Sequence, residues 1–219
     1  MQSQNTSMNS IADIRQDYKM NSLLETNIDA NPFIQFTKWF DDALASKIEE
    51  VNAMTLATVG IDNRPSARIV LLKGMSENGF EFFTNYDSHK ANEMAHNNNV
   101  ALIFFWKELE RQIRIEGTVE KLSIEKSDAY YNSRPLESRI GAWSSPQSKI
   151  IENREILEEN VLAIRHKFDN IEITRPIFWG GYIVQPTLVE FWQGRSSRLH
   201  DRIEYFLEEG VWKTRRLAP

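Results

Sequence analysis

The sequence predicts a mainly β protein with peripheral helices, in which antiparallel strands form a closed or split barrel. Three observations lead to this fold class. From Met54 onward, apolar and polar residues repeatedly alternate with the period of two that half-buried strands require. Short turns rich in Gly, Asn and Asp separate these segments, which favours antiparallel neighbours. No internal repeat or low-complexity linker divides the 219 residues, so we expect one domain at 31–219 behind an N-terminal arm at 1–30.

The chain begins with a polar, weakly patterned segment, and residues 1–30 therefore predict a partly flexible arm. Asn31 and Pro32 then provide a helix cap and a first-turn proline. Apolar residues at helical spacing follow, which indicates a helix that covers the core. These residues are Phe33, Phe36, Phe40 and Leu44.

The strand-like segments come next and occupy most of the remaining chain. The first three form an antiparallel meander, and the last pair is joined by a turn at Gly210. The predicted strands are residues 54–59, 66–73, 80–85, 100–106, 111–120, 177–184, 188–193, 203–207 and 211–216.

The helices lie between these strands. Ser88 can cap a short helix, and Pro135 ends another one. The predicted helices are residues 88–96, 123–131 and 149–168, and residues 136–148 are predicted to form a loop. That loop carries Arg139 and Trp143, a content that often indicates a ligand or a partner.

Composition excludes several classes of function. The net charge of −5 argues against a general nucleic-acid-binding protein. The absence of cysteine excludes disulfides, thiolate metal sites and cysteine nucleophiles, and is typical of a cytoplasmic protein. The polar N-terminus does not resemble a signal peptide, and no apolar run approaches the roughly 20 residues of a membrane helix. We therefore expect a cytoplasmic protein without nucleic-acid or membrane partners.

Familiar catalytic motifs are also absent from the sequence. It contains neither GxGxxG nor a Walker-type loop, which argues against common nucleotide folds, and it contains no GxSxG of a serine hydrolase. The four histidines do not have metal-ligand spacing, so no metal site is predicted.

Two clusters are rich in groups that bind phosphate. One combines Arg68 and Lys73 with Thr84 and the helix start Ser88–Lys90, where backbone N–H groups and the helix dipole also favour an anion. A capped surface helix with a solvated lysine is the simpler interpretation. The other cluster is Tyr130, Arg134 and Ser138, which could equally be a helix stop with a surface arginine.

A third cluster lies in the segment EFWQGRSSRLHDR at 190–202. Its aromatic and arginine side chains fit a flat anionic ligand, whereas the alternative is a hairpin with a solvated turn. Asp201 could pair with Arg198 or Arg202 as a structural ion pair of small energy. The candidate binding residues are Trp192, Arg198, His200 and Arg202.

Several separated blocks in the same order resemble the pyridoxamine 5′-phosphate oxidase family. The resemblance runs from about residue 11 to the last residue. The blocks are RIVLLK (68–73), FFTN (82–85), SHKA (88–91), LERQIRIEG (109–117), YYNSRPLESRIGAW (130–143), PQS (146–148), FWGGY (178–182), EFWQG with RLHDR (190–202) and the C-terminal RRLAP.

The resemblance implies a homodimeric, FMN-binding split β-barrel that is antiparallel and Greek-key-like, with FMN at the subunit interface. It also implies the oxidation of pyridoxamine or pyridoxine 5′-phosphate by O₂ to pyridoxal 5′-phosphate with release of hydrogen peroxide, in vitamin B6 metabolism. A related split-barrel flavin reductase with another substrate is one alternative. A non-catalytic protein that binds FMN or pyridoxal phosphate is a second, and an all-β interaction module is a third.

The resemblance also assigns roles by position. Arg68 and Lys90 match residues on the FMN phosphate, and Arg198 and His200 match catalytic residues over the substrate pyridine ring. The residues matching FMN contacts are Arg68, Ile69, Val70, Leu71, Lys73, Phe83, Thr84, Ser88, His89, Lys90, Gln112, Gln147, Ser148, Trp192 and Arg202. Those matching substrate contacts are Lys73, Tyr130, Arg134, Ser138, Arg198 and His200, joined by Arg15 and Tyr18 from the arm, which help to close the site in this family.

Two positions depart from the family pattern. Phe83 stands where tyrosine is frequent, so a hydroxyl is lost. His89 stands where arginine is usual beside the flavin phosphate, and an unperturbed imidazole is mostly neutral at pH 7. The second departure is expected to weaken FMN binding unless Lys90, Arg68 and the helix terminus compensate for it.

Overall fold

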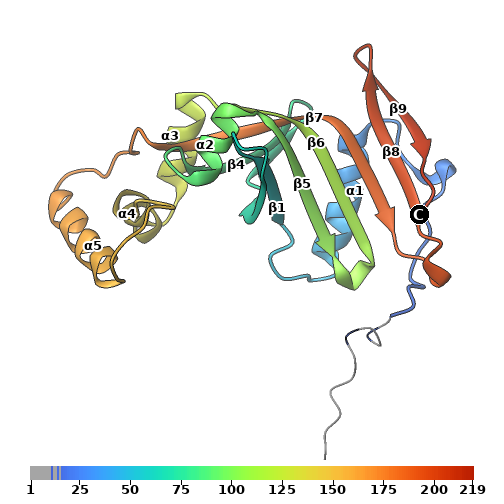
Figure 1. Cartoon of the computed structure of the whole chain (residues 1–219), viewed down its shortest axis with the longest axis horizontal. Coiled ribbons are helices and arrows are strands. Elements are labelled where there is room, and N and C mark those ends of the chain that lie inside the picture. The colour runs from blue at the N-terminus through green and yellow to red at the C-terminus, as the bar shows by residue number, and fades with distance from the viewer. Residues whose placement is uncertain (1–10, 12–13, 15) are drawn as a thin grey trace, which may run out of the picture.

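One antiparallel sheet carries the fold of this computed structural model, which describes residues 11, 14 and 16–219 (Figure 1). The nine strands of this described part are β1 (Ala53–Val59), β2 (Pro65–Leu71), β3 (Gly74–Ser76), β4 (Gly79–Asn85), β5 (Asn99–Trp106), β6 (Arg111–Lys121), β7 (Trp179–Gln193), β8 (Asp201–Glu208) and β9 (Val211–Arg216). The helices are α1 (Pro32–Ala45), α2 (His89–His96), α3 (Ile124–Ser133), α4 (Leu136–Ser144) and α5 (Glu155–Lys167), with short 3₁₀ turns at Glu25–Asn27, Lys107–Leu109 and Ser196–Arg198.

The sheet curls back on itself between β2 and β3. The strand order is β2-β1-β5-β6-β7-β4-β3, and just two residues join its two ends. Leu72 donates its N–H to Asn52 beside β1, and Lys73 donates its N–H to Glu81 on β4, each at 2.8 Å. Consecutive residues thus bond to opposite ends of the sheet. The prediction of a mainly antiparallel split barrel is confirmed.

The long strand β7 divides the barrel. Its first half pairs with β4 and its second half with β8, while β6 follows it on the other side. The register of β6 and β7 shifts at Gly117, where a Cβ atom would lie 2.0 Å from the carbonyl oxygen of Gln185. Our division into strands at 177–184 and 188–193 is wrong. Pro186 lies at this bulge, where a missing N–H is tolerated, so it does not end the strand.

Helix α1 closes the barrel interior with aromatic side chains. The Asn31 side chain accepts the N–H of Phe33 at 2.8 Å and so caps the predicted start. Phe36 is 1% exposed, and its ring lies 5.0 Å from that of Phe80 and 5.2 Å from that of Phe104. Leu44, which we placed on the buried face, is 52% exposed, because the buried stripe ends at Ala43 instead.

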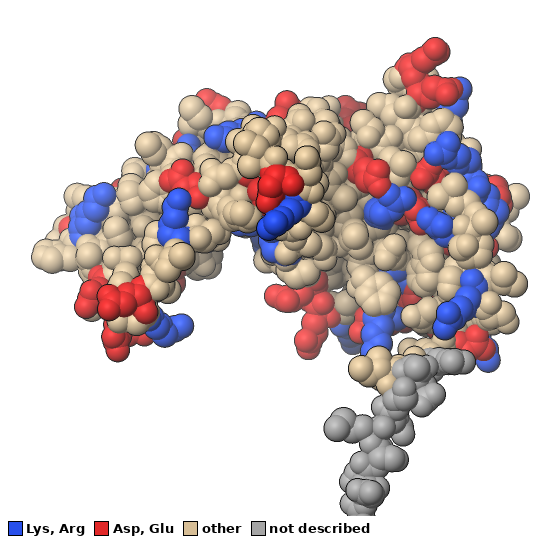
Figure 2. All heavy atoms as spheres, in the orientation of Figure 1, with Lys and Arg blue, Asp and Glu red and all other residues tan. Residues whose placement is uncertain are grey.

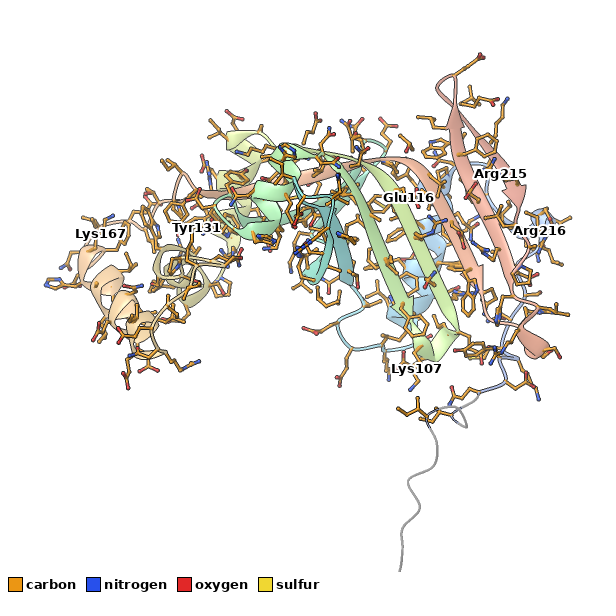
Figure 3. The ribbon with its side chains drawn as sticks, viewed as in Figure 1. Lys107, Glu116, Tyr131, Lys167, Arg215 and Arg216 are labelled. Atoms are coloured by element: carbon orange, nitrogen blue, oxygen red, sulfur yellow. The ribbon has the colours of Figure 1, made fainter. Side chains whose placement is uncertain are left out.

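Helices α3, α4 and α5 form a lobe at one end of the sheet (Figure 1). Tyr131, labelled in Figure 3, belongs to α3 of this lobe. The predicted loop at 136–148 is wrong, because residues 136–144 form α4. Pro135 occupies the N-cap position and so precedes a new helix as well as ending α3. Helix α5 is shorter than the predicted 149–168. Within the described residues, no helix is both long enough and apolar enough to span a membrane.

Residues 16–30 run along the outer end of β8 and β9 as an ordered strap. Leu23 donates its N–H to Asp201 at 3.0 Å, and Arg216 donates to the Leu23 carbonyl at 2.8 Å. Arg216, which is labelled at the end of β9 in Figure 3, also pairs with Glu25. Arg15, one of the predicted substrate contacts, lies outside the described residues.

Replacing Phe36 by alanine is expected to lower the free energy of unfolding by about 3–5 kcal/mol, because the cavity it leaves lies between α1 and the sheet. Leu44→Ala on the same helix is the matched control and is expected to change it by less than about 0.5 kcal/mol. Urea unfolding of both variants measures the difference. Equal losses would show that α1 is not anchored through Phe36.

Candidate functional site

A cavity of about 360 Å³ collects most of the residues predicted to bind phosphates. We call it the cationic cavity, because Arg68, Lys73, Lys90 and Arg134 line it and none of its lining residues is acidic. Its full lining is Arg68, Ile69, Val70, Leu71, Lys73, Phe83, Thr84, Lys90, Tyr130, Arg134, Gln147 and Trp179. Strands β2 and β4, helix α2 and the helical lobe all contribute, so residues far apart in sequence converge here.

Lys90 is buried in this cavity by neutral partners. Its Nζ donates to Gln147 Oε1 at 3.0 Å, to Thr84 Oγ1 at 3.1 Å and to Ser88 Oγ at 3.4 Å. Ser88 is itself fully buried and caps α2. Burial, together with the nearby positive charge of Arg68, lowers the pKa of Lys90 to about 8. A bound anion would relieve both effects.

Arg68 is paired with a buried carboxylate behind the cavity wall. Its Nη2 lies 3.1 Å from Glu93, an acidic residue of α2. Burial raises the pKa of Glu93, but hydrogen bonds from Thr58, Ser66 and Arg68 outweigh this effect, and the pKa lies below its usual value. His89 also contacts Glu93, at 3.1 Å, and lines a neighbouring cavity with it. The structure therefore does not place His89 in the cationic cavity.

Arg134 lies in the cationic cavity on an aromatic stack. Its guanidinium is 4.6 Å from the ring centre of Trp179, and Phe83 stacks on Tyr130 at 3.9 Å and on Trp179 at 5.7 Å. Gly181 leaves room for Phe83, since a Cβ there would lie 2.7 Å from its ring. Arg134 Nη1 is buried and has no acceptor among the described residues, and burial lowers the arginine's pKa. An unpaired buried donor is costly, so a ligand oxygen is the partner it lacks.

A second group, the strand cluster, consists of Tyr18, Trp192 and His200. The ring of His200 lies 4.7 Å from that of Trp192, and Tyr18 lies 5.7 Å from Trp192 and 5.9 Å from His200. His200 Nδ1 accepts the backbone N–H of Arg195 at 3.1 Å. A backbone N–H can only donate, so Nε2 is the nitrogen that carries the proton.

Arg202 and Gln112 border the strand cluster through the sheet, since both pair with Trp192 in register. Glu190, which is 2% exposed, accepts two hydrogen bonds from Arg202, at 2.8 and 3.0 Å, and one from Arg114 at 2.6 Å. The Glu190 hydrogen bond raises the pKa of Arg202. Figure 2 shows acidic and basic side chains interspersed on this part of the surface.

The remaining predicted residues lie at the margins of these two groups. Arg198 is exposed and has a left-handed backbone (φ 61°), and Ser148, also exposed, has φ 69°. Ser138 lies on α4 and does not line the cationic cavity. The predicted pairing of Asp201 is wrong, because it bonds Arg216 at 2.8 Å and approaches Arg195 at 3.7 Å. The β8–β9 register brings Arg216 opposite the start of β8.

The two groups lie apart within one chain. Trp179 and Trp192 are at opposite ends of β7, and thirteen residues of extended strand span at most about 43 Å. Across the sheet, Leu71 and Trp192 are separated by four strand pairings, or about 19 Å, with Phe105 and Gln112 between them. Phe105 is 55% exposed and Ile69 is 64% exposed on this face.

Sequence reasoning missed Trp179 and the Glu93 network. Trp179 begins β7 just before two glycines, and an aromatic residue against a glycine pair was the available signal. Thr58 and Ser66 are polar residues of β1 and β2 that point toward Glu93, and Thr58 is 1% exposed. A polar residue at a buried position of an apolar strand indicates a buried partner, although it does not name that partner.

Two family models match the chain. Residues 40–168 match the model described as pyridoxamine 5′-phosphate oxidase. Residues 179–219 match the model described as pyridoxine 5′-phosphate oxidase C-terminal dimerisation region. Together they cover the cationic cavity and two members of the strand cluster, Trp192 and His200.

Curated relatives give the same assignment, and a solved structure has a similar fold. A pyridoxine/pyridoxamine 5′-phosphate oxidase of Nostoc punctiforme is 57% identical over 95% of this chain and 98% of its own length. One from Cupriavidus pinatubonensis is 55% identical over 97% of this chain and its full length. The crystal structure of PhzG from Burkholderia lata, in complex with tetrahydrophenazine-1-carboxylic acid, superposes with a TM-score of 0.85 at 26% identity and covers 91% of this chain and 99% of that one.

The affinity for FMN, the cofactor expected from the sequence, should fall as the pH rises above 8. Lys90 loses its proton above its pKa of about 8 in the ligand-free fold, whereas a bound phosphate holds that proton. Linkage then predicts an increase of about tenfold in the dissociation constant between pH 7 and pH 9. Fluorescence titration measures it. Lys90→Arg stays charged and should show a nearly flat profile, and identical slopes for the two proteins would contradict the role of Lys90.

Proposed function

Because the chain belongs to the pyridoxamine 5′-phosphate oxidase family, we propose that it oxidises pyridoxamine 5′-phosphate and pyridoxine 5′-phosphate to pyridoxal 5′-phosphate. Arg134 is the observation that supports this proposal most directly. Its buried Nη1 has no acceptor among the described residues, and Arg134 lines a cavity together with three other cations and no carboxylate. A substrate phosphate supplies the missing acceptor.

FMN is the cofactor, and the residues of the cavity fit it. Lys90 and Arg68 lie together with the N-terminus of α2, which suits the flavin phosphate, and the apolar edge of β2 at 69–71 offers a surface for the ring. When bound, FMN would supply the acceptor for a hydride from the 4′ carbon of the substrate, and O₂ with two protons would then take up the two electrons as hydrogen peroxide. Water completes the amine reaction, and ammonia is released from pyridoxamine 5′-phosphate.

Lys73, Tyr130 and Arg134, which all line the cationic cavity, hold the substrate phosphate in this proposal. Tyr130 and Arg134 are fixed by the stack with Phe83 and Trp179, so remote binding energy orients the reacting carbon. Phe83 takes part in this stack through its ring, so the stack itself does not require a tyrosine hydroxyl at this position.

His200 and Arg198 act on the pyridine ring from the other side. His200 presents a protonated Nε2 as a hydrogen-bond donor, because Nδ1 is occupied by the Arg195 N–H. We assign His200 chiefly to positioning. Arg198, on an exposed and left-handed backbone, adds positive charge near the reacting carbon. Tyr18 packs against Trp192 and His200 and covers part of their surface.

A homodimer with FMN between the subunits brings the two halves of the site together. The cationic cavity and the strand cluster lie apart in one chain, so one ligand does not reach both. Ile69, Leu71 and Phe105 form an exposed apolar strip on the sheet face between them. A second copy that covers this strip would place its strand cluster against the first copy's cavity. The match to a dimerisation region at residues 179–219 supports this arrangement.

A second candidate is a flavin enzyme with a non-phosphorylated acid as substrate. The likeness to PhzG, whose structure contains a phenazine carboxylic acid, favours it. Arg134 could bind a carboxylate as readily as a phosphate. Sequence identity distinguishes the two candidates, because this chain is 57% identical to a pyridoxine/pyridoxamine 5′-phosphate oxidase and 26% identical to PhzG.

The purified protein should be yellow and should bleach when pyridoxine 5′-phosphate is added without oxygen, because the substrate reduces the flavin. Colour should return in air with one hydrogen peroxide per turnover. Visible absorption measures both steps. A colourless preparation that does not take up FMN would exclude a flavin enzyme, and a yellow one that never bleaches would indicate a carrier or another substrate.

The matched variant for this experiment is Arg134→Met. It should retain FMN and still bleach, but the substrate concentration at half-bleaching should rise at least about tenfold, since a charged hydrogen bond to phosphate is lost. An unchanged substrate concentration at half-bleaching would show that Arg134 does not bind the substrate.

Two variants, assayed at a substrate concentration too low for either to turn over alone, should restore activity when they share a dimer. Arg134→Ala disables the cavity half, and His200→Ala disables the strand half. A mixed dimer then has one site with both lesions and one with neither, so random mixing should recover about a quarter of wild-type activity. Co-expression with two affinity tags measures it. Arg134→Ala mixed with Lys73→Ala, both in the cavity half, is the control and should recover none. If the first mixture shows no more activity than the control mixture, each active site is formed within a single chain.

A further inference from the structure

Glu93 is a buried carboxylate beside the cofactor site that the proposed reaction does not use. Its side chain is 7% exposed. It accepts hydrogen bonds from Thr58 Oγ1 on β1 at 2.6 Å and from Ser66 Oγ on β2 at 2.8 Å. The carboxylate therefore ties α2 to the edge of the sheet, at the level of the cationic cavity.

Two cationic or potentially cationic side chains also converge on Glu93. Arg68 Nη2 and His89 Nε2 each lie 3.1 Å from it. Two hydroxyls, a guanidinium and an imidazole form the kind of donor set that proteins place around a phosphate. In this chain those four donor groups contact the Glu93 carboxylate instead of a phosphate.

Arg68 has few donors left for a ligand. Its Nη1 donates to the Leu56 carbonyl at 3.3 Å and to Thr58, and its Nη2 donates to Ser66 at 2.6 Å and to Glu93. These bonds use all four Nη hydrogens. Only Nε–H has no acceptor among residues 11, 14 and 16–219. A ligand in the cationic cavity thus meets one N–H of Arg68, unless the guanidinium leaves Glu93.

Lys90 differs from Arg68 in this respect. Its three contacts, with Thr84, Ser88 and Gln147, are all to neutral groups. Glu93 therefore compensates the charge of Arg68 and leaves that of Lys90 to the ligand. A flavin phosphate has the same sign as Glu93, so the two anions repel each other and require the same guanidinium.

We propose that Glu93 is an internal counter-ion that competes with the cofactor phosphate for Arg68, and so lowers the affinity of this chain for FMN. The inference rests on the proposed function, because it takes FMN as the ligand. Glu93 acts on the phosphate through Arg68 and is a positioning residue. In the ligand-free protein it stabilises a half-buried arginine, and on binding it gives up Nη2 to the phosphate.

Glu93→Gln tests this competition, because it removes the charge and keeps an acceptor of the same length. FMN should bind at least about threefold more tightly to the variant in a fluorescence titration of flavin-free protein. Riboflavin, which lacks the phosphate, should bind both proteins equally. Glu93→Asp keeps the charge and should leave FMN affinity within about twofold of wild type.

Unchanged or weaker FMN binding by Glu93→Gln would overturn the inference, and so would an equal gain for riboflavin. If that variant does not fold, the crystal structure of the wild type with FMN decides. An Nη2–Glu93 separation beyond ion-pair distance supports the exchange, and a retained pair with no Nη contact to phosphate overturns it. Failure of the wild type to bind any FMN is a separate result, which removes the proposed function and this inference with it.

Discussion

Four cationic side chains line the cationic cavity, and none of its lining residues is acidic. The properties of this cavity depend on which groups compensate those charges. Arg68 is paired with Glu93, Lys90 is surrounded by neutral oxygens, and Arg134 lies on Trp179 with one donor unpaired. These three environments differ in free energy, because burying a cation without a counter-ion is the least favourable of them. Two anionic groups, one for Lys90 and one for Arg134, would complete the compensation. This is the charge pattern expected of a site for two phosphorylated ligands.

The geometry of β7 determines how such a site is assembled. One strand pairs with β4 at its start, where Trp179 supports Arg134, and with β8 at its end, where Trp192 meets His200. Because the strand is extended, the two functional ends cannot fold toward each other within the chain. The bulge at Gly117 lets the strand change partners without a break. A strand that separates two half-sites is well suited to a dimer, in which each copy supplies the half that the other needs.

The fold was largely predictable because strand periodicity and turn residues are local signals. The strand segments, the capped start of α1 at Asn31 and the Ser88 cap of α2 followed from short stretches of sequence. The wrong predictions concern residues whose effect on the backbone depends on a tertiary contact or on the element that follows. Pro186 suggested a break, but it occupies a bulge opposite β6. Pro135 ends α3 and also begins α4, and the loop prediction considered just the first effect.

The sequence predicted most of the residues that line the cationic cavity, but it did not predict which side chains contact one another there. The resemblance pointed to eleven of the residues that line the cationic cavity, and these are residues of phosphate-binding or apolar type. It could not reveal that His89 turns to Glu93, since that contact depends on one helical turn of α2 packing against Thr58 and Ser66. Histidine in place of arginine and a carboxylate four residues later belong to one ion pair. The substitution at 89 is therefore better understood as part of the Glu93 network than as a missing phosphate ligand. In the proposed site, Arg68, Lys90 and Glu93 together would set the charge that a flavin phosphate meets.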